Sequence, residues 1–125
     1  MNQSDLPAFI EHLNASWVDQ NYAALADCYH PEVVLLPPDV GTPITGREAV
    51  ITTYRDFHAL VNAREFEVTE LSFFPHTAAT MCHMRFAITY ELNDRVMHES
   101  GMDIYTIVPG PENAPVISWR AQITL

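Results

Sequence analysis

Two carboxylates in the second half of the chain, Glu99 and Asp103, are the residues best placed for acid–base chemistry. Both fall in a strand-like segment, and because they are four residues apart their side chains point to the same face. At ~3.3 Å per residue they are separated by about 13 Å, which is too far for them to share a proton. We therefore expect them to hold opposite ends of one ligand in a pocket.

Asp103 has two neighbours on that face, Met84 and Tyr105, that cannot solvate a charge. Such burial favours the neutral acid unless an arginine approaches, and Arg120 and Arg55 are the candidates. A neutral carboxylic acid donates a hydrogen bond, which suits a ligand carbonyl or a developing oxyanion. The alternative is structural: Asp103 hydrogen-bonds a nearby tyrosine and only stabilises the core.

The remaining reactive side chains form no recognisable catalytic or metal motif. Cys82 and His83 are adjacent in a strand, so they face opposite sides and cannot act together as nucleophile and base. The six histidines show no zinc-ligand spacing, and we expect no metal site. His58, one helical turn after Tyr54, either reaches the pocket as a third acid–base residue or ends a helix where its charge suits the dipole. Lysine is absent, which excludes Schiff-base and pyridoxal phosphate chemistry, and nothing in the sequence calls for a cofactor.

The strands that carry the carboxylates form a predictable hairpin. Residues 78–92 and 95–108 alternate in polarity, and Asn93-Asp94 between them is typical of a tight hairpin turn. The turn sets the register, and the facing pairs are then Cys82 with Tyr105, Met84 with Asp103, Phe86 with Gly101, and Ile88 with Glu99. Because these residues are mostly large and apolar, we expect their face to point toward the helices.

The opposite face of the hairpin is the candidate for contact with another chain. It carries Met81, His83, Arg85, Ala87, Met102 and Ile104. Apolar side chains mixed with arginine are typical of the core of an interface. We therefore predict a homodimer joined through this outer sheet face.

The helices that would cover the sheet come from the first half of the chain. Ser4 or Asp5 can cap a first helix that has Pro7 in its first turn, where the missing N–H costs little. Its apolar face consists of Phe9, Ile10, Leu13 and Trp17. Asn21 caps a short second helix that continues to His30-Pro31.

A strand, a turn and a third helix follow. Residues 33–36 are a continuous apolar run, short enough for a buried strand, and Pro37-Pro38 ends it. The stretch Thr45-Gly46-Arg47-Glu48 fits a capping box, in which the Thr45 and Glu48 side chains each accept from the other residue's amide. The helix that follows has an apolar face of Val50, Tyr54, Phe57 and Val61.

From residue 62 onward the polarity pattern has a period of two, which predicts strands. The apolar phase slips between Val68 and Leu71, and we expect a β-bulge there that bends the strand. Residues 109–115 form a loop, and residues 116–124 form the last strand. Helices followed by a run of strands predict one α+β domain spanning residues 1–125.

The overall composition excludes several classes of partner. The net charge of −10 and the lack of a basic patch argue against nucleic acid. No apolar run approaches the ~20 residues that a membrane span needs, and the polar N-terminus has no signal pattern. Cys28 and Cys82 are far apart in a chain large enough to fold without disulfides. We expect reduced cysteines, a cytoplasmic location, and no nucleic-acid or membrane partner.

Four segments carry a family resemblance by their order: the first helix with Trp17, then LADCYHPEVVL, ITGREAV and ISWRAQITL. With them the chain resembles the nuclear transport factor 2-like superfamily, in its SnoaL-like and ketosteroid-isomerase-like group, over nearly its whole length. The resemblance implies a strongly curved antiparallel sheet wrapped as a cone around N-terminal helices, commonly in a homodimer. The superfamily contains isomerases, cyclases, dehydratases, hydrolases and non-catalytic modules, so the fold does not settle the function.

The chain departs from the steroid isomerases of this group at two functional positions. Alignment on Tyr29 and on Gly46-Arg47-Glu48 places Pro37 where those enzymes have their aspartate base, and Leu13 where they have an oxyanion-hole tyrosine. Only their protonated aspartate has a counterpart, Asp103. The resemblance therefore implies a related pocket without steroid delta-isomerase activity.

We predict a pocket between the first helix, the third helix and the concave sheet that binds a small hydrophobic or ring-bearing molecule. Its expected wall consists of Trp17, Tyr54, Phe86, Ile88, Tyr90, Tyr105 and Trp119. One function class is an acid–base isomerase, cyclase or hydrolase that uses Asp103, Glu99 and His58. The other is a non-catalytic ligand-binding or dimerisation module. An unpaired inward carboxylate indicates the enzyme, and one neutralised by arginine indicates the module.

Overall fold

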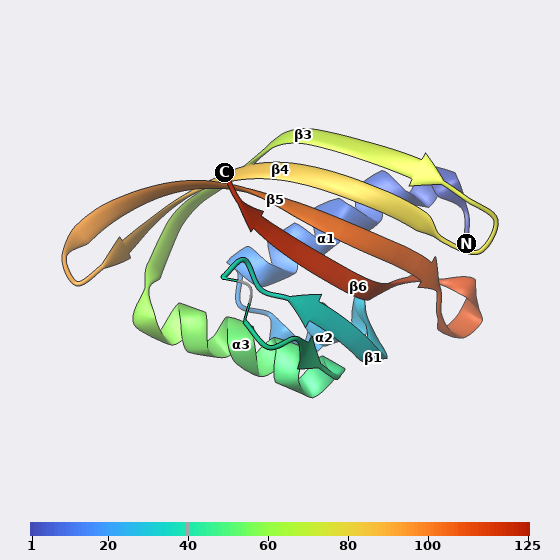
Figure 1. Cartoon of the computed structure of the whole chain (residues 1–125), viewed down its shortest axis with the longest axis horizontal. Helices are drawn as coiled ribbons and strands as arrows, with labels where there is room; N and C mark the ends of the chain where they lie inside the picture. The colour runs from blue at the N-terminus through green and yellow to red at the C-terminus, as the bar shows by residue number, and fades with distance from the viewer. Residues whose placement is uncertain (40) are drawn as a thin grey trace.

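The structure, a computed structural model, describes residues 1–39 and 41–125. Figure 1 shows the helices gathered on one side of a long curved sheet. In chain order the elements are α1 (Leu6–Val18), α2 (Tyr22–Asp27), β1 (Tyr29–Leu36), β2 (Ile44–Thr45), α3 (Arg47–Leu60), β3 (Asn62–Pro75), β4 (Thr80–Leu92), β5 (Arg95–Pro109) and β6 (Pro115–Thr124). Short 3₁₀ helices at Gln3–Asp5 and Pro111–Asn113 precede α1 and β6. Within these described ranges, no helix is long and apolar enough to cross a membrane.

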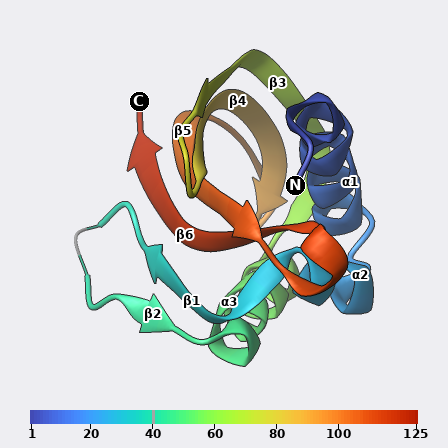
Figure 2. The same ribbon diagram turned by 90° about the vertical axis from the view of Figure 1, so that its right-hand side faces the viewer.

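The six strands form one sheet in the order β2-β1-β6-β5-β4-β3. Neighbours run antiparallel except β1 and β6, which are parallel. The sheet curls into a cone, and α1 lies across the open side of the curve (Figure 2). Buried helix residues such as Leu13 and Val50 share one core with strand residues such as Met84 and Ile107. The prediction of an α+β cone is confirmed.

The β4–β5 hairpin has the register that its turn predicts. All four expected pairs are present, among them Met84 opposite Asp103. Asn93 and Asp94 have φ angles of 50° and 63°, which are the left-handed values that a type I′ turn requires. The inner face of β5 therefore carries both carboxylates toward the helices.

Strand β3 bends as it follows β4. Its pairing shifts between Ala63 and Glu65 and again between Val68 and Glu70. The second shift lies where the polarity pattern predicted a β-bulge. Because a bulge increases the local twist, these two positions help to close the cone over α1.

The start of α3 differs from the predicted capping box. Thr45 belongs to β2 and pairs with Val34, so its backbone is held in a strand rather than at a helix end. The residue before the helix is Gly46, whose φ of 92° is accessible to glycine, and no side chain caps the helix. The Gly46 N–H instead donates to the Val33 carbonyl at 2.8 Å.

The predicted caps of α1 are also wrong. Ser4 lies inside the 3₁₀ helix, and Asp5 stands at the N-cap position without a side-chain hydrogen bond. Asn2 is the residue that caps this region, because its side chain accepts from the Ser4 N–H at 3.1 Å. Pro7 does lie in the first turn of α1, as expected.

Strand β1 begins at Tyr29, earlier than predicted, because α2 ends at Asp27. Tyr29 pairs with Ile117 of β6, and the Ile117 N–H donates to the Cys28 carbonyl at 2.8 Å. This contact joins residues about ninety positions apart, and it overrides the local helical pattern. Tyr29 thereby turns into the interior, where it becomes part of the site.

Candidate functional site

A cavity of about 260 Å³ lies between α1, α3 and the concave face of the sheet. Its apolar wall is formed mainly by Leu13, Trp17, Phe57, Phe66, Phe86 and Ile88. Its polar lining includes Asn14, Glu99, Asp103, Arg120 and Gln122. A mostly apolar cavity with a few convergent polar groups is typical of a small-molecule site.

Gly101 shapes the aromatic wall of this cavity. A Cβ atom at this position would lie 2.6 Å from the Phe86 ring, which therefore rests directly on the glycine backbone. The Phe86 ring stacks on Phe66 with centroids 5.4 Å apart and planes inclined by 23°. Together these three residues form a flat apolar surface beside the polar groups.

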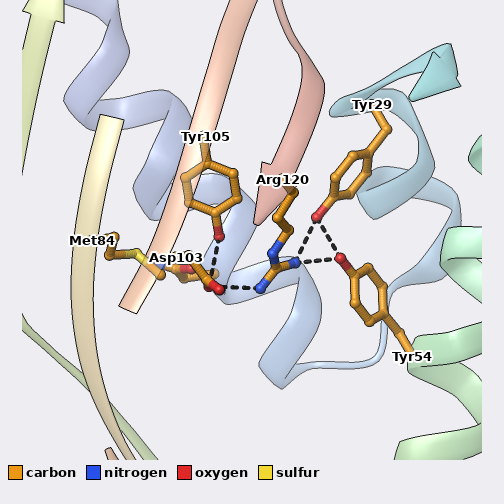
Figure 3. A network of polar contacts seen from close by, with 7 residues as sticks. Tyr29, Tyr54, Met84, Asp103, Tyr105 and Arg120 are labelled. Carbon is orange, nitrogen blue, oxygen red and sulfur yellow. Dashed lines mark hydrogen bonds and ion pairs between the residues drawn. The ribbon is translucent and has the colours of Figure 1, made fainter. Parts of the chain in front are cut away.

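The polar end of the cavity is a buried network centred on Arg120 (Figure 3). Its guanidinium donates to Asp103 Oδ2 at 2.7 Å and to the Tyr29 hydroxyl at 2.8 Å, and it also donates to the Tyr54 hydroxyl. The Tyr105 hydroxyl donates to the same Asp103 oxygen at 3.1 Å. Asp103 is 1% exposed and Arg120 8% exposed, so the ion pair is shielded from water. Of the two arginines that the sequence offered as partners of Asp103, Arg120 is the one that pairs with it.

Three strands and a helix bring this network together. Asp103 and Tyr105 are two residues apart on β5, so both side chains point inward, and Arg120 on β6 pairs with Tyr105. Tyr29 comes from the start of β1 and Tyr54 from the middle of α3. Arg55, the other candidate partner, is exposed on α3 and lies over the Tyr22 ring at 5.0 Å, away from Asp103.

The network leaves one acceptor free. Asp103 Oδ1 and Arg120 Nε are buried without a hydrogen-bond partner among the described residues. Nε belongs to a guanidinium held between the rings of Tyr54 and Tyr105, 5.2 Å from each centroid. Asp103 itself lines the cavity, and Oδ1 is the oxygen of its carboxylate that has no partner.

The two neighbouring tyrosines also leave one donor free. The Tyr29 and Tyr54 hydroxyls are 2.9 Å apart, and both accept from Arg120, so one of them donates to the other. Tyr29 is fully buried and has no second acceptor among the described contacts, whereas Tyr54 lines the cavity. Either hydroxyl can be the donor of this bond; when Tyr29 donates to Tyr54, the unpaired O–H belongs to Tyr54, the tyrosine of the two that lines the cavity.

The tyrosines of the network are protonated donors. Burial raises the pKa of Tyr29, Tyr54 and Tyr105, although the nearby arginine opposes the rise. Burial alone lowers the pKa of Arg120, but attraction to Asp103 and to the tyrosines raises it by more, so it lies well above its ordinary value. The polar end therefore combines a permanent cation with neutral hydroxyls.

Glu99 lies at the other end of the cavity lining and is exposed. The Tyr90 hydroxyl donates to Glu99 Oε1 at 2.7 Å. Burial raises the pKa of Tyr90 to about 12, and the hydrogen bond to Glu99 adds to the rise. Tyr90 was expected in the cavity wall but is not part of the lining; instead it donates to the carboxylate of Glu99, which is.

Among the other predicted residues, Trp17, Tyr54, Phe86, Ile88 and Tyr105 line the cavity, whereas Trp119 and His58 do not. Trp119 is 48% exposed on the outer face. The reason is a bulge in β6. Ile107 pairs with Ile117 but Thr106 pairs with Trp119, so β6 has one extra residue between these pairs, and beyond it the side chains that point inward shift by one position. The placement of Trp119 in the wall is therefore wrong.

His58 lies behind Trp17 rather than in the cavity. Its ring is 4.4 Å from the Trp17 ring, and its Nδ1 is 2.8 Å from the Tyr22 hydroxyl. Burial lowers the pKa of His58, so the neutral imidazole is favoured.

In the part of the chain that the structure describes, no three His, Cys, Asp or Glu side chains gather as metal ligands do.

Sequence reasoning missed Tyr29 and Asn14. Tyr29 was placed in a helix, and nothing local indicates its pairing with β6. Asn14 lines the cavity, and its Nδ2 donates only to the Met84 sulfur at 3.3 Å, a weak acceptor that leaves the amide available. The sequence could have predicted that Asn14 faces the cavity, since it lies between Ile10 and Trp17 at helical spacing on an otherwise apolar face.

The fold and the cavity define a nuclear transport factor 2-like domain, in which a curved sheet and helices enclose a small-molecule-sized space. More specifically, the chain belongs to the SnoaL-like domain family, whose model matches residues 8–110. No curated protein shows significant sequence similarity to the chain.

Several solved structures share the fold. A ketosteroid isomerase-like protein from Erwinia carotovora atroseptica has a TM-score of 0.83 at 11% identity, covering 100% of this chain and 98% of that one. ActVI-ORFA from Streptomyces coelicolor has a TM-score of 0.81 at 11% identity, covering 97% and 95%. A Catenulispora acidiphila protein in complex with S-DNPA has a TM-score of 0.76 at 20% identity, covering 98% and 95%. At these identities the similarity establishes the fold alone.

Proposed function

We propose that this protein binds a small hydrophobic, ring-bearing molecule in the cavity between α1, α3 and the sheet. The observation that carries the proposal is the free Asp103 Oδ1, a buried acceptor at the polar end of an otherwise aromatic cavity. A cavity of ~150 Å³ holds benzene, so the volume of about 260 Å³ suits one or two rings. The complex of the Catenulispora acidiphila protein with S-DNPA supports small-molecule binding by a protein of this fold.

Calorimetric titration with naphthalene and 2-naphthol tests the proposal directly. Phe86→Ala removes half of the stacked wall, and we expect roughly tenfold weaker binding because aromatic stacking contributes about 1 kcal/mol beyond burial. Trp119→Ala is the matched control, since it removes an aromatic ring from the opposite face of the sheet. Equal loss of binding in both variants, or no binding by the wild type, would contradict the proposed function.

The pairing of Asp103 with Arg120 favours a binding role over catalysis, because a neutralised carboxylate was the feature expected of a non-catalytic module. Acid–base catalysis of an isomerase, cyclase or hydrolase type is the second candidate. It is favoured by one observation: Oδ1 of Asp103, a carboxylate that lines the cavity, has no hydrogen-bond partner among the described residues. Glu99 can assist from the rim of the cavity, whereas His58 is not part of the cavity lining and packs against Trp17.

Turnover assays with Asp103→Asn separate the two candidates. The substitution keeps the shape of the side chain and removes the titrating group, so an enzyme loses turnover and a binding module has none to lose. Steroid delta-isomerase activity is expected to be absent, since Leu13 contributes only an apolar surface to the cavity and Pro37 has no titrating group. Efficient isomerisation of a 3-oxo-Δ5 steroid would contradict that expectation.

We also propose a homodimer through the outer sheet face. Met81, His83, Met102 and Ile104 are only half-buried there in the single chain, and Trp119 is exposed beside them. Such an apolar face is a liability unless covered. Sedimentation should give twice the chain mass for the wild type and the chain mass for Ile104→Asp; a monomeric wild type at micromolar concentration would exclude the dimer.

The cytoplasmic location expected from Cys28 and Cys82, both buried and free, stays a prediction.

A further inference from the structure

We infer that the cavity selects a neutral ring ligand bearing a hydroxyl that donates a hydrogen bond, such as a phenol or enol, and rejects the matching carboxylate. This inference rests on the proposed ligand-binding function and names the ligand class. It is carried by the charges and the free hydrogen-bonding atoms at the polar end of the cavity.

The charged groups of the lining do not suit an anion. Glu99, Asp103 and Arg120 are the charged residues among the described cavity lining, which gives a net charge of −1. Arg120 is the single cation among them, and its terminal nitrogens already donate to Asp103 and to two tyrosines. A ligand carboxylate therefore meets Asp103 without a free cation to compensate the repulsion.

Two N–H donors of Arg120 remain, one on Nε and one on the nitrogen that binds Asp103, and they do not change this conclusion because Asp103 already compensates the positive charge. Nε is fully buried, and the guanidinium is enclosed between the rings of Tyr54 and Tyr105. Arg120 lines the cavity, but an anion that binds its guanidinium competes with Asp103 for the same positive charge and weakens a buried ion pair. The chain as a whole adds to the discrimination, because its net charge of −10 repels anions at longer range.

The free atoms instead match a hydroxyl. The unpaired Asp103 Oδ1 accepts the ligand O–H, and the Tyr54 O–H, which is unpaired when Tyr29 donates to Tyr54, donates to the same ligand oxygen. A hydrogen bond to a carboxylate is stronger than one between neutral groups, so a ligand without the O–H leaves a buried charged acceptor unpaired. The adjacent ring then lies on the apolar surface of Phe86 and Phe66.

The test compares three probes of one ring system, 2-naphthol, 2-naphthoate and naphthalene, by calorimetric titration of the full chain at pH 7. We expect 2-naphthol to bind roughly tenfold or more tightly than either of the others, because it alone satisfies Asp103 without adding a negative charge. Naphthoate binding as tightly as naphthol, with naphthalene also binding, would overturn the inference and leave the proposed function intact. Failure of all three probes overturns both.

Two variants test which carboxylate makes the cavity prefer 2-naphthol over 2-naphthoate. Asp103→Asn leaves Arg120 uncompensated, so the preference should reverse: naphthol affinity falls and naphthoate affinity rises. Glu99→Gln removes the rim charge while the Asp103–Arg120 pair stays, and it should raise naphthoate affinity by a smaller factor. If Asp103→Asn does not fold, as judged by circular dichroism, Glu99→Gln still decides, since an unchanged naphthoate affinity would contradict the charge argument.

Discussion

The two inward carboxylates of β5 lie on the same strand and the same face, and each accepts a hydrogen bond from a different tyrosine, yet they occupy opposite environments. Asp103 accepts from Tyr105 and is buried in an ion pair with Arg120. Glu99 accepts from Tyr90 and is exposed at the rim, without an arginine partner among the described contacts. The difference shows that position along the cone, rather than residue type or local sequence, sets the chemistry of each acid. Asp103 is shielded from solvent by its network, whereas Glu99 can respond to solvent and salt.

The largest expected effect comes from removing the cation that distinguishes the two acids. Arg120→Met leaves Asp103 buried without its partner, and we expect a loss of about 3–5 kcal/mol in the free energy of unfolding. Urea denaturation measures the loss. Arg55→Met is the matched control, because Arg55 is exposed, and it should cost less than about 1 kcal/mol. Similar costs for the two variants would show that burial does not separate these arginines.

Removing the tyrosine donors compares the two acids directly. Tyr105→Phe deletes a buried hydrogen bond to a charged oxygen and should cost about 1.5–3 kcal/mol of unfolding free energy. Tyr90→Phe deletes the corresponding bond to an exposed acid, which water can replace, and should cost less than about 1 kcal/mol. The reverse order in denaturation experiments would contradict the assigned environments.

Gly101 lies between the two acids on the same face of β5, and a side chain there should alter the cavity more than the fold. The Cβ of Gly101→Ala pushes the Phe86 ring toward the cavity and should cost about 1–2 kcal/mol by overpacking. The ring can yield, so the protein should still fold. Titration with 2-naphthol should then show weaker binding; undiminished affinity would mean that the ligand does not use the Phe86 surface.

The smallest effect concerns His58, which was predicted beside the two acids but lies outside the cavity. Burial lowers its pKa from 6.5 in the folded state, so the unfolded chain binds the proton more readily. Stability should therefore fall as the pH drops below about 6.5, with a slope of at most about 1.4 kcal/mol per pH unit from this group. In His58→Gln, denaturation between pH 7.5 and 5.5 should show a shallower slope than in the wild type; an equal slope would rule out this contribution.

The parts of the fold that short-range chemistry controls were predictable. Asn93-Asp94 dictates a tight turn, and from that turn follow the register of the hairpin and the inward direction of Asp103. The helical spacing of Leu13 and Trp17 likewise placed both against the cavity. In each case the deciding interaction lies within a few residues of the pattern that predicts it.

The parts that depend on distant pairing were not predictable. Tyr29 leaves its helical pattern because β1 pairs in parallel with β6, and Thr45 loses its cap because it pairs with Val34. Trp119 was placed on the wrong face because the bulge opposite Thr106 shifts the phase of β6. Alternation alone cannot reveal a shift that a partner strand imposes. The network around Arg120 joins residues of distant strands, and therefore it could not be predicted without the folded sheet.

The positions of the two tryptophans have a spectroscopic consequence. Trp17 lines the cavity and contacts the His58 ring, whereas Trp119 is half-exposed on the opposite face of the sheet. One chain therefore contains two optical reporters that respond to different events, one to filling of the cavity and one to covering of the outer face. With Trp119→Phe or Trp17→Phe, fluorescence follows either event alone, without any attached dye.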